Sequence, residues 1–97
     1  MALTKEIFND RVEVITEFKH VQVREATVIK EDGKEVSRTF RRWVHHAGTL
    51  DNTDTYQKTD VDNIADTAEV KAVCTAVWSQ AVHDLFEAEL KANRARQ

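Results

Sequence analysis

The sequence of 97 residues contains no proline, two glycines and one cysteine, and each shortage excludes a class of protein. With only Gly33 and Gly48, the chain lacks the glycine-rich loops that cradle phosphates, and its secondary structure elements are expected to be long. The single cysteine, Cys74, excludes an internal disulfide. No apolar run approaches the about 20 residues that span a bilayer, so we expect no membrane partner.

Charged residues are unevenly distributed along the sequence. The chain has 14 basic and 17 acidic residues, a net charge of −3. Residues 47–69 hold six acidic groups and one basic group, whereas the segments before and after are each slightly basic. This stretch is rich in Thr, Asn and Gln, which predicts an acidic loop over about 47–65. The remaining composition is typical of a globular protein, and we expect a single domain over 1–97.

In the first half of the chain, apolar and polar residues alternate as they do in half-buried strands. This pattern predicts strands near 11–17, 20–31 and 34–45. Between the last two, Asp32-Gly33 favours a two-residue hairpin turn. Pairing outward from that turn places Glu25 opposite Phe40 and flanks it with two arginines, and it places Val21 opposite Val44. The three strands are therefore expected to form an antiparallel meander.

From Asp66 onward, apolar residues recur at helical spacing and alanine is frequent. The pattern predicts one helix over about 66–93, capped by Asp66 with Glu69 in its first turn. Such a helix would be roughly 40 Å long, whereas a compact chain of this size is roughly 33 Å across. The expected fold class is α+β: a three-stranded antiparallel β-meander packed on one long C-terminal α-helix.

Both faces of the expected sheet, and a wide stripe of the helix, carry apolar residues. On the expected register, one sheet face presents Val21, Val23, Ile29, Val36, Phe40 and Val44, and the other presents Ala26, Val28 and Trp43. Two explanations stay open. In the first, the surplus apolar surface is buried on another molecule. In the second, the N-terminal residues Leu3, Ile7 and Phe8 belong to a short helix that covers the second face of the sheet. The candidate interface residues are Phe40, Arg41, Trp43, Trp78 and Phe86.

The segment from Arg38 to His46 interleaves cations with aromatic residues. Strand alternation places Arg38 and Arg42 on one face and Arg41 and Trp43 on the other. A nucleic-acid groove needs its cations on one side, and the chain as a whole is acidic. Nucleic-acid binding through Arg38 to Trp43 is therefore the alternative to self-association.

The sequence offers no arrangement for catalysis or metal binding. Its histidines and Cys74 lack the spacing of zinc ligands, and the acidic stretches 51–54 and 60–63 lack the central glycine of a calcium loop. Cys74 has apolar helical neighbours, among which a cysteine behaves as an inert hydrophobe. No paired acid or triad is present. We therefore predict no enzyme activity, no metal, no cofactor and no small-molecule substrate.

Three stretches resemble small uncharacterised proteins of marine bacteriophages that are encoded among virion structural genes. They are FKHVQVREATVI (18–29), EVSRTFRR (35–42) and EVKAVCTAVW (69–78). The resemblance implies a structural or assembly protein of the tail, neck or capsid, located in the virion and, during assembly, in the host cytoplasm. Its implied partners are the protein itself and other virion proteins. No binding residue carries over from the resemblance.

Overall fold

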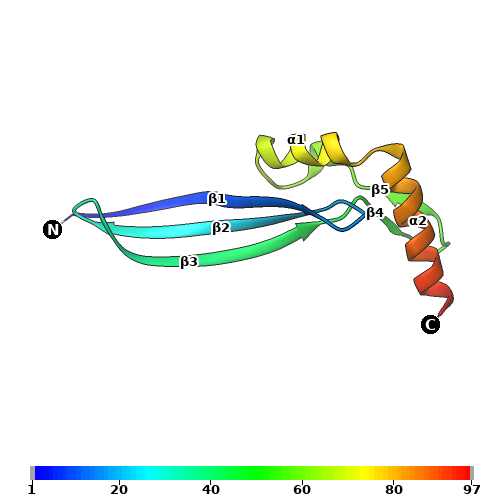
Figure 1. Cartoon of the computed structure of the whole chain (residues 1–97), viewed down its shortest axis with the longest axis horizontal. Helices are drawn as coiled ribbons and strands as arrows, with labels where there is room; N and C mark the ends of the chain where they lie inside the picture. The colour runs from blue at the N-terminus through cyan, green and yellow to red at the C-terminus, as the bar shows by residue number, and fades with distance from the viewer. Residues whose placement is uncertain (1, 97) are drawn as a thin grey trace.

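The alternating segments of the first half form one antiparallel sheet in the computed structural model, which describes residues 2–96 (Figure 1). Its strands are β1 (Leu3–Ile15), β2 (His20–Glu31) and β3 (Lys34–His45), in the spatial order β1-β2-β3. The molecule measures 59 × 28 × 22 Å and has a radius of gyration of 17.7 Å, whereas a compact chain of this length has about 13 Å. The α+β class and the meander are confirmed, but much of the sheet projects beyond the helices as an arm.

The hairpin turn between β2 and β3 forms where the sequence predicts it. Asp32 and Gly33 have φ angles of 52° and 84°, the positive values that a two-residue type I′ turn requires. Glu31 lies opposite Lys34, and Lys30 lies opposite Glu35, as expected. The local turn chemistry therefore sets the start of the pairing.

Beyond these two pairs, the predicted register is wrong by one residue. Ile29 pairs with Ser37, so Val36 is left over as a bulge. Every later pair shifts: Glu25 lies opposite Arg41, and Val21 lies opposite His45. Because neighbouring side chains point to opposite faces, the shift also exchanges the faces of β3. Phe40 and Val44 share a face with Ala26 and Val28, and Trp43 shares the other face with Val21 and Val23.

The N-terminal residues extend the first strand, so the predicted start near residue 11 and the alternative of a short covering helix are both wrong. Leu3, Ile7 and Phe8 all lie in β1, opposite Glu31, Thr27 and Ala26 respectively. The physical reason is that β2 offers 12 residues of unpaired backbone, which a strand satisfies and a helix does not. The second face of the sheet is therefore left without a covering element.

The single helix predicted over 66–93 is two helices, α1 (Ala68–Val77) and α2 (Gln80–Ala95). The chain turns at Trp78, whose indole Nε1 donates to the carbonyl of Lys19 at 2.7 Å. Ser79 then caps α2, its hydroxyl accepting from the amide of Val82. Thr67, rather than Asp66, caps α1 in the same way.

The segment predicted as an acidic loop contains a short hairpin, β4 (Gly48–Leu50) with β5 (Tyr56–Lys58), and a 3₁₀ turn, η1 (Val61–Asn63). The carboxylate of Asp51 organises the hairpin loop by accepting hydrogen bonds from Thr53, Thr55 and Gln57. These bonds hold the pKa of Asp51 far below its usual range, the hydroxyl of Thr53 contributing most. The polar composition therefore builds an ordered turn that packs beside α2.

The hydrophobic core lies at one end of the sheet, where the two helices meet the start of β2 (Figure 1). Val21 and Val23 of β2 are fully buried there against Val70 and Cys74 of α1. The other buried members of the cluster are Ala47, Trp78, Val82 and Phe86. The core thus anchors the base of the arm and leaves its far end without a second layer.

Candidate interaction surface

The arm is a single-layered sheet that is exposed on both faces. Residues 34–42 of β3 are all exposed, and so are residues 3–8 of β1. Because successive side chains alternate between faces, uninterrupted exposure means that neither face is covered. The large apolar side chains of the sheet that are left in water are Leu3, Ile7, Phe8, Val14, Val36, Phe40 and Val44, between 39% and 64% exposed. Val14 and Val44 lie at the base of the arm, and the other five lie farther out.

Phe40 lies midway along the edge strand β3, on one face of the sheet. Phe8 and Phe40 flank Ala26 in a row across the three strands, and Ala26 is fully buried beneath its neighbours. The guanidinium carbon of Arg24 lies 4.4 Å from the centre of the Phe40 ring, and that of Arg42 lies 5.7 Å from it. Phe40 itself remains 42% exposed, so this candidate residue is accessible to a partner.

Arg41 and Trp43 lie on the opposite face, as the alternation predicts. The guanidinium of Arg41 stacks 4.9 Å from the Trp43 ring and lies 3.5 Å from the carboxylate of Glu25. The indole Nε1 of Trp43 donates to a carboxylate oxygen of Asp66 at 2.8 Å. The Arg41 side chain is nevertheless 72% exposed and accessible to a partner, whereas Trp43 mainly connects the sheet to the start of α1.

Trp78 and Phe86, the two helical candidates for the interface, are core residues. Each is 7% exposed. Phe86 packs against Phe18 and His20, with ring centres 5.5 and 5.1 Å away. The helical spacing marks these positions as apolar, but it does not distinguish an internal contact from an external one. In this structure the accessible candidates are confined to the arm.

The structure also assembles a row of arginines that the sequence analysis missed. Arg11, Arg24 and Arg42 lie directly opposite one another across the three strands. Arg24 forms two hydrogen bonds with Asp10 at 2.7 and 2.9 Å, and this pairing lowers the pKa of Asp10. Within residues 2–96, Arg42 has no carboxylate at ion-pair distance. Only the strand register, which the bulges set, could have revealed this row.

Asp66 is the polar connection between β3 and α1. Its side chain is 3% exposed and accepts from Trp43, from His45 Nε2 at 2.7 Å and from the amide of Thr67 at 2.8 Å. Burial alone would raise the pKa of Asp66, but the hydrogen bonds from His45, Trp43 and Thr67 outweigh it, and the pKa is lowered. The carboxylate is thus held charged as a structural group.

Two histidines meet at the base of the arm. Nδ1 of His20 lies 3.0 Å from Nδ1 of His46, and both rings lie against Phe86. Burial, and then the neighbouring His46, lower the pKa of His20. A neutral pair can share one proton in a hydrogen bond, whereas two imidazolium rings at this distance repel each other.

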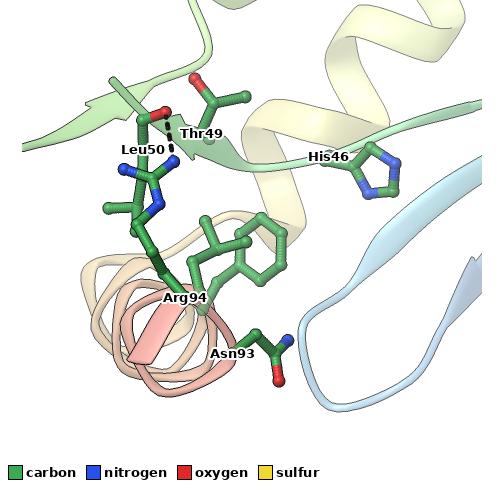
Figure 2. Close-up of a pocket in the computed structure, with 8 residues that line it drawn as sticks. His46, Thr49, Leu50, Asn93 and Arg94 are labelled. Carbon is green, nitrogen blue, oxygen red and sulfur yellow. Dashed lines mark hydrogen bonds between the residues drawn. The ribbon is translucent and has the colours of Figure 1, made fainter. Parts of the chain in front are cut away.

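A surface cavity of about 380 Å³ lies between β4 and the second half of α2, and Figure 2 shows its lining. Its apolar wall includes Leu50, Phe86 and Leu90. Arg94 lies at its edge and donates to the carbonyls of Leu50 and Asp51 and to the carboxylate of Asp54. The guanidinium is therefore committed to holding the hairpin against α2, and the cavity presents no unpaired cation to a ligand.

The titratable groups also include the side-chain types that hold metal ions. Within residues 2–96, no three histidine, cysteine or acidic side chains converge as metal ligands. Cys74 is buried, and burial raises the pKa of its thiol, which opposes thiolate chemistry. No helix in the same part of the chain is long and apolar enough to cross a membrane.

The comparisons with known proteins add no family. Neither the protein-family models, nor the curated proteins, nor the solved structures contain a match to this chain.

Proposed function

We propose that this chain is a non-enzymatic structural or assembly protein of a phage virion and that it acts through self-association. The observation that carries the proposal is the uncovered arm, whose exposed apolar side chains lie on both faces and whose outer strands, among residues 2–96, pair on one side only. Exposed apolar area and unpaired strand edges are the features that subunits of an assembly bury on their neighbours.

A sheet that has no core on either face gains little free energy from burial. An isolated sheet of few strands is marginally stable in water because its backbone ordering is not offset by burial on either face. Here the core reaches only the base of the arm, and Ala26 and Val28 are shielded by their own cross-strand neighbours. A neighbouring molecule that covers the arm would supply the missing burial, and symmetric assemblies supply such neighbours in every subunit.

The virion setting rests on the resemblance of residues 18–42 and 69–78 to proteins encoded among phage structural genes. On this proposal the protein lies in the tail, the neck or the capsid, and its partners are itself and other virion proteins. The test is mass spectrometry of purified virions. Detection of the chain at constant stoichiometry supports the proposal, and its absence from particles at any stoichiometry contradicts the virion setting.

Self-association is tested separately by size-exclusion chromatography with light scattering over a range of protein concentrations. The wild type is expected to form oligomers, and the paired substitutions Phe8→Ser and Phe40→Ser on the arm are expected to weaken them. Leu85→Ser is the matched control because Leu85 is 50% exposed but lies on α2, away from the arm. A wild-type monomer at all concentrations, or equal weakening by the control, contradicts the proposed role of the arm.

Nucleic-acid binding is a second candidate, favoured by the row of Arg11, Arg24 and Arg42 on one face. Salt-dependent retention on DNA that falls in Arg42→Ala, but not in the control Arg96→Ala at the end of α2, would support it. Each phosphate contact that is lost reduces the slope of log affinity against log salt by about 0.9. Absence of DNA binding at low salt removes this candidate.

A further inference from the structure

We propose that the partner of the arm is a second copy of this chain, bound through its β1 edge to the β3 edge of the first copy, with parallel strands. This inference rests on the proposed self-association and specifies its geometry. Within residues 2–96, β1 and β3 pair only with β2, so each leaves one backbone edge of 12 or 13 residues unpaired. Neither strand contains proline, which would block pairing.

Charge distinguishes this pairing from the two symmetric ones. The charged side chains of β1 give a net charge of −1: Lys5, Glu6, Asp10, Arg11 and Glu13. Those of β3 give +3: Lys34, Glu35, Arg38, Arg41 and Arg42. Pairing β3 with another β3 would place the most basic strand of the molecule against itself, which like-charge repulsion opposes. Only β1 with β3 brings strands of opposite net charge together.

The strand register supports the same pairing in the outer part of the arm, whereas nearer the base it brings Arg11 level with Arg42, a like-charge pair that offsets part of the gain. β1 and β3 run in the same direction, and through β2 the structure places Glu6 level with Arg38, Ile7 with Thr39 and Phe8 with Phe40. If a second copy lies alongside at the same level, these pairs become direct neighbours on matching faces. The Glu6 carboxylate, which binds Lys30 in its own copy, then meets the Arg38 guanidinium, which binds Glu35, and two exposed phenylalanines meet on the same face.

The helices α1 and α2 of successive copies do not overlap in this arrangement. Each copy adds three strands, so the usual twist of roughly 20 to 25° per strand rotates successive copies by roughly 60 to 75°. The helices lie toward one end of a molecule 59 Å long. We take the α1–α2 end of each copy to lie roughly 20 Å from the axis about which the sheet twists. The rotation and the spacing of three strands then separate the α1–α2 ends of successive copies by roughly 25 Å. That separation is comparable with the 28 × 22 Å cross-section of the chain.

The test is disulfide trapping in the full-length chain carrying Ile7→Cys together with Thr39→Cys. Within one copy these positions are separated by β2 and lie roughly 10 Å apart, too far for an internal disulfide, which needs Cα atoms within about 7 Å. Between copies they become neighbours on one face. Mild oxidation is therefore expected to yield a ladder of covalent dimers, trimers and larger species on a non-reducing gel, whereas buried Cys74 does not react.

The matched control carries Thr4→Cys with Thr39→Cys, whose side chains point to opposite faces and lie at different levels of the sheet, and it is expected to give no ladder. The single variants Ile7→Cys and Thr39→Cys are expected to stay monomeric on the gel. Strong dimers of one single variant would show that like edges pair and would overturn the inference. Oligomers in light scattering without a ladder would overturn the edge pairing and leave self-association intact, whereas monomers in both assays would refute both.

Discussion

The connection between the sheet and the helices depends on one buried carboxylate, and its removal gives a quantitative prediction. Asp66→Ala deletes the acceptor for Trp43 Nε1, His45 Nε2 and the amide of Thr67, at 2.8, 2.7 and 2.8 Å. Each bond contributes about 1 kcal/mol net, and a charged acceptor raises this toward about 1.5 to 3 kcal/mol. Because Asp66 is 3% exposed, water does not replace the acceptor without rearrangement.

Bonds to one carboxylate are not additive, so we expect Asp66→Ala to lower the free energy of unfolding by about 3 to 5 kcal/mol, less than three separate bonds would give. A domain of this length has about 5 to 15 kcal/mol in total, so the variant should be folded but markedly weakened. The measurement is urea denaturation followed by circular dichroism, with the slope of the transition compared between variants. Asp62→Ala is the matched control because Asp62 is exposed and its carboxylate makes no hydrogen bond in residues 2–96; its effect should stay within about 0.5 kcal/mol.

The same carboxylate predicts a pH dependence of definite sign. The hydrogen bonds lower the pKa of Asp66 below its unfolded value, so its stabilisation is present above the ordinary carboxyl pKa and is lost as the pH falls through the lowered pKa. The stability difference between wild type and Asp66→Ala should therefore be full at pH 7 and shrink on acidification below about 4. A loss of less than about 1 kcal/mol at pH 7, or a difference that grows in acid, would refute this account.

Two further predictions concern the hairpin and the histidines at the base of the arm. Gly48→Ala should destabilise the chain and disturb the Tyr56 fluorescence, because a Cβ there would clash with the Tyr56 ring and lie 2.6 Å from the backbone oxygen of Gln57. Gly33→Ala has open space around it and should cost only the strain of its positive φ, about 1 kcal/mol. The pKa of His20 is lowered in the folded state, so the melting temperature should fall as the pH drops below about 6.5, and His20→Gln, which cannot be protonated beside His46, should flatten that part of the profile.

The extent to which the sequence predicts this fold differs between its local and its long-range features. The Asp-Gly turn and the bounds of β2 and β3 follow from local chemistry and are confirmed. The bulge at Val36 has no sequence signal, because a β-branched residue fits a regular strand equally well. It nevertheless determines which residues share each face. The arginine row and the opposition of Glu25 to Arg41 both depend on it.

The break between α1 and α2 illustrates the same limit. Apolar pairs recur every four residues through it, which predicts continuity, and no glycine or proline marks a stop. The local signal is Ser79, a residue that favours helix N-caps, but serine also occurs within helices. What fixes the break is the indole of Trp78, which donates to the carbonyl of Lys19, 59 positions away. That bond depends on the tertiary fold, so no local pattern encodes it.

The broken helix also explains why the arm remains uncovered. A straight helix of the predicted length, lying along the sheet, would have covered most of one face, and the surplus apolar surface would have been internal. Instead α1 lies over the base of the sheet, and α2 turns away to pack on the β4–β5 hairpin (Figure 1). Because of the turn at Trp78, the helices leave the arm uncovered and instead form a compact base that contains the whole core cluster. Because the chain's own helices do not cover the arm, another molecule can bind there. The edges of β1 and β3 are therefore the places at which to test for a bound partner.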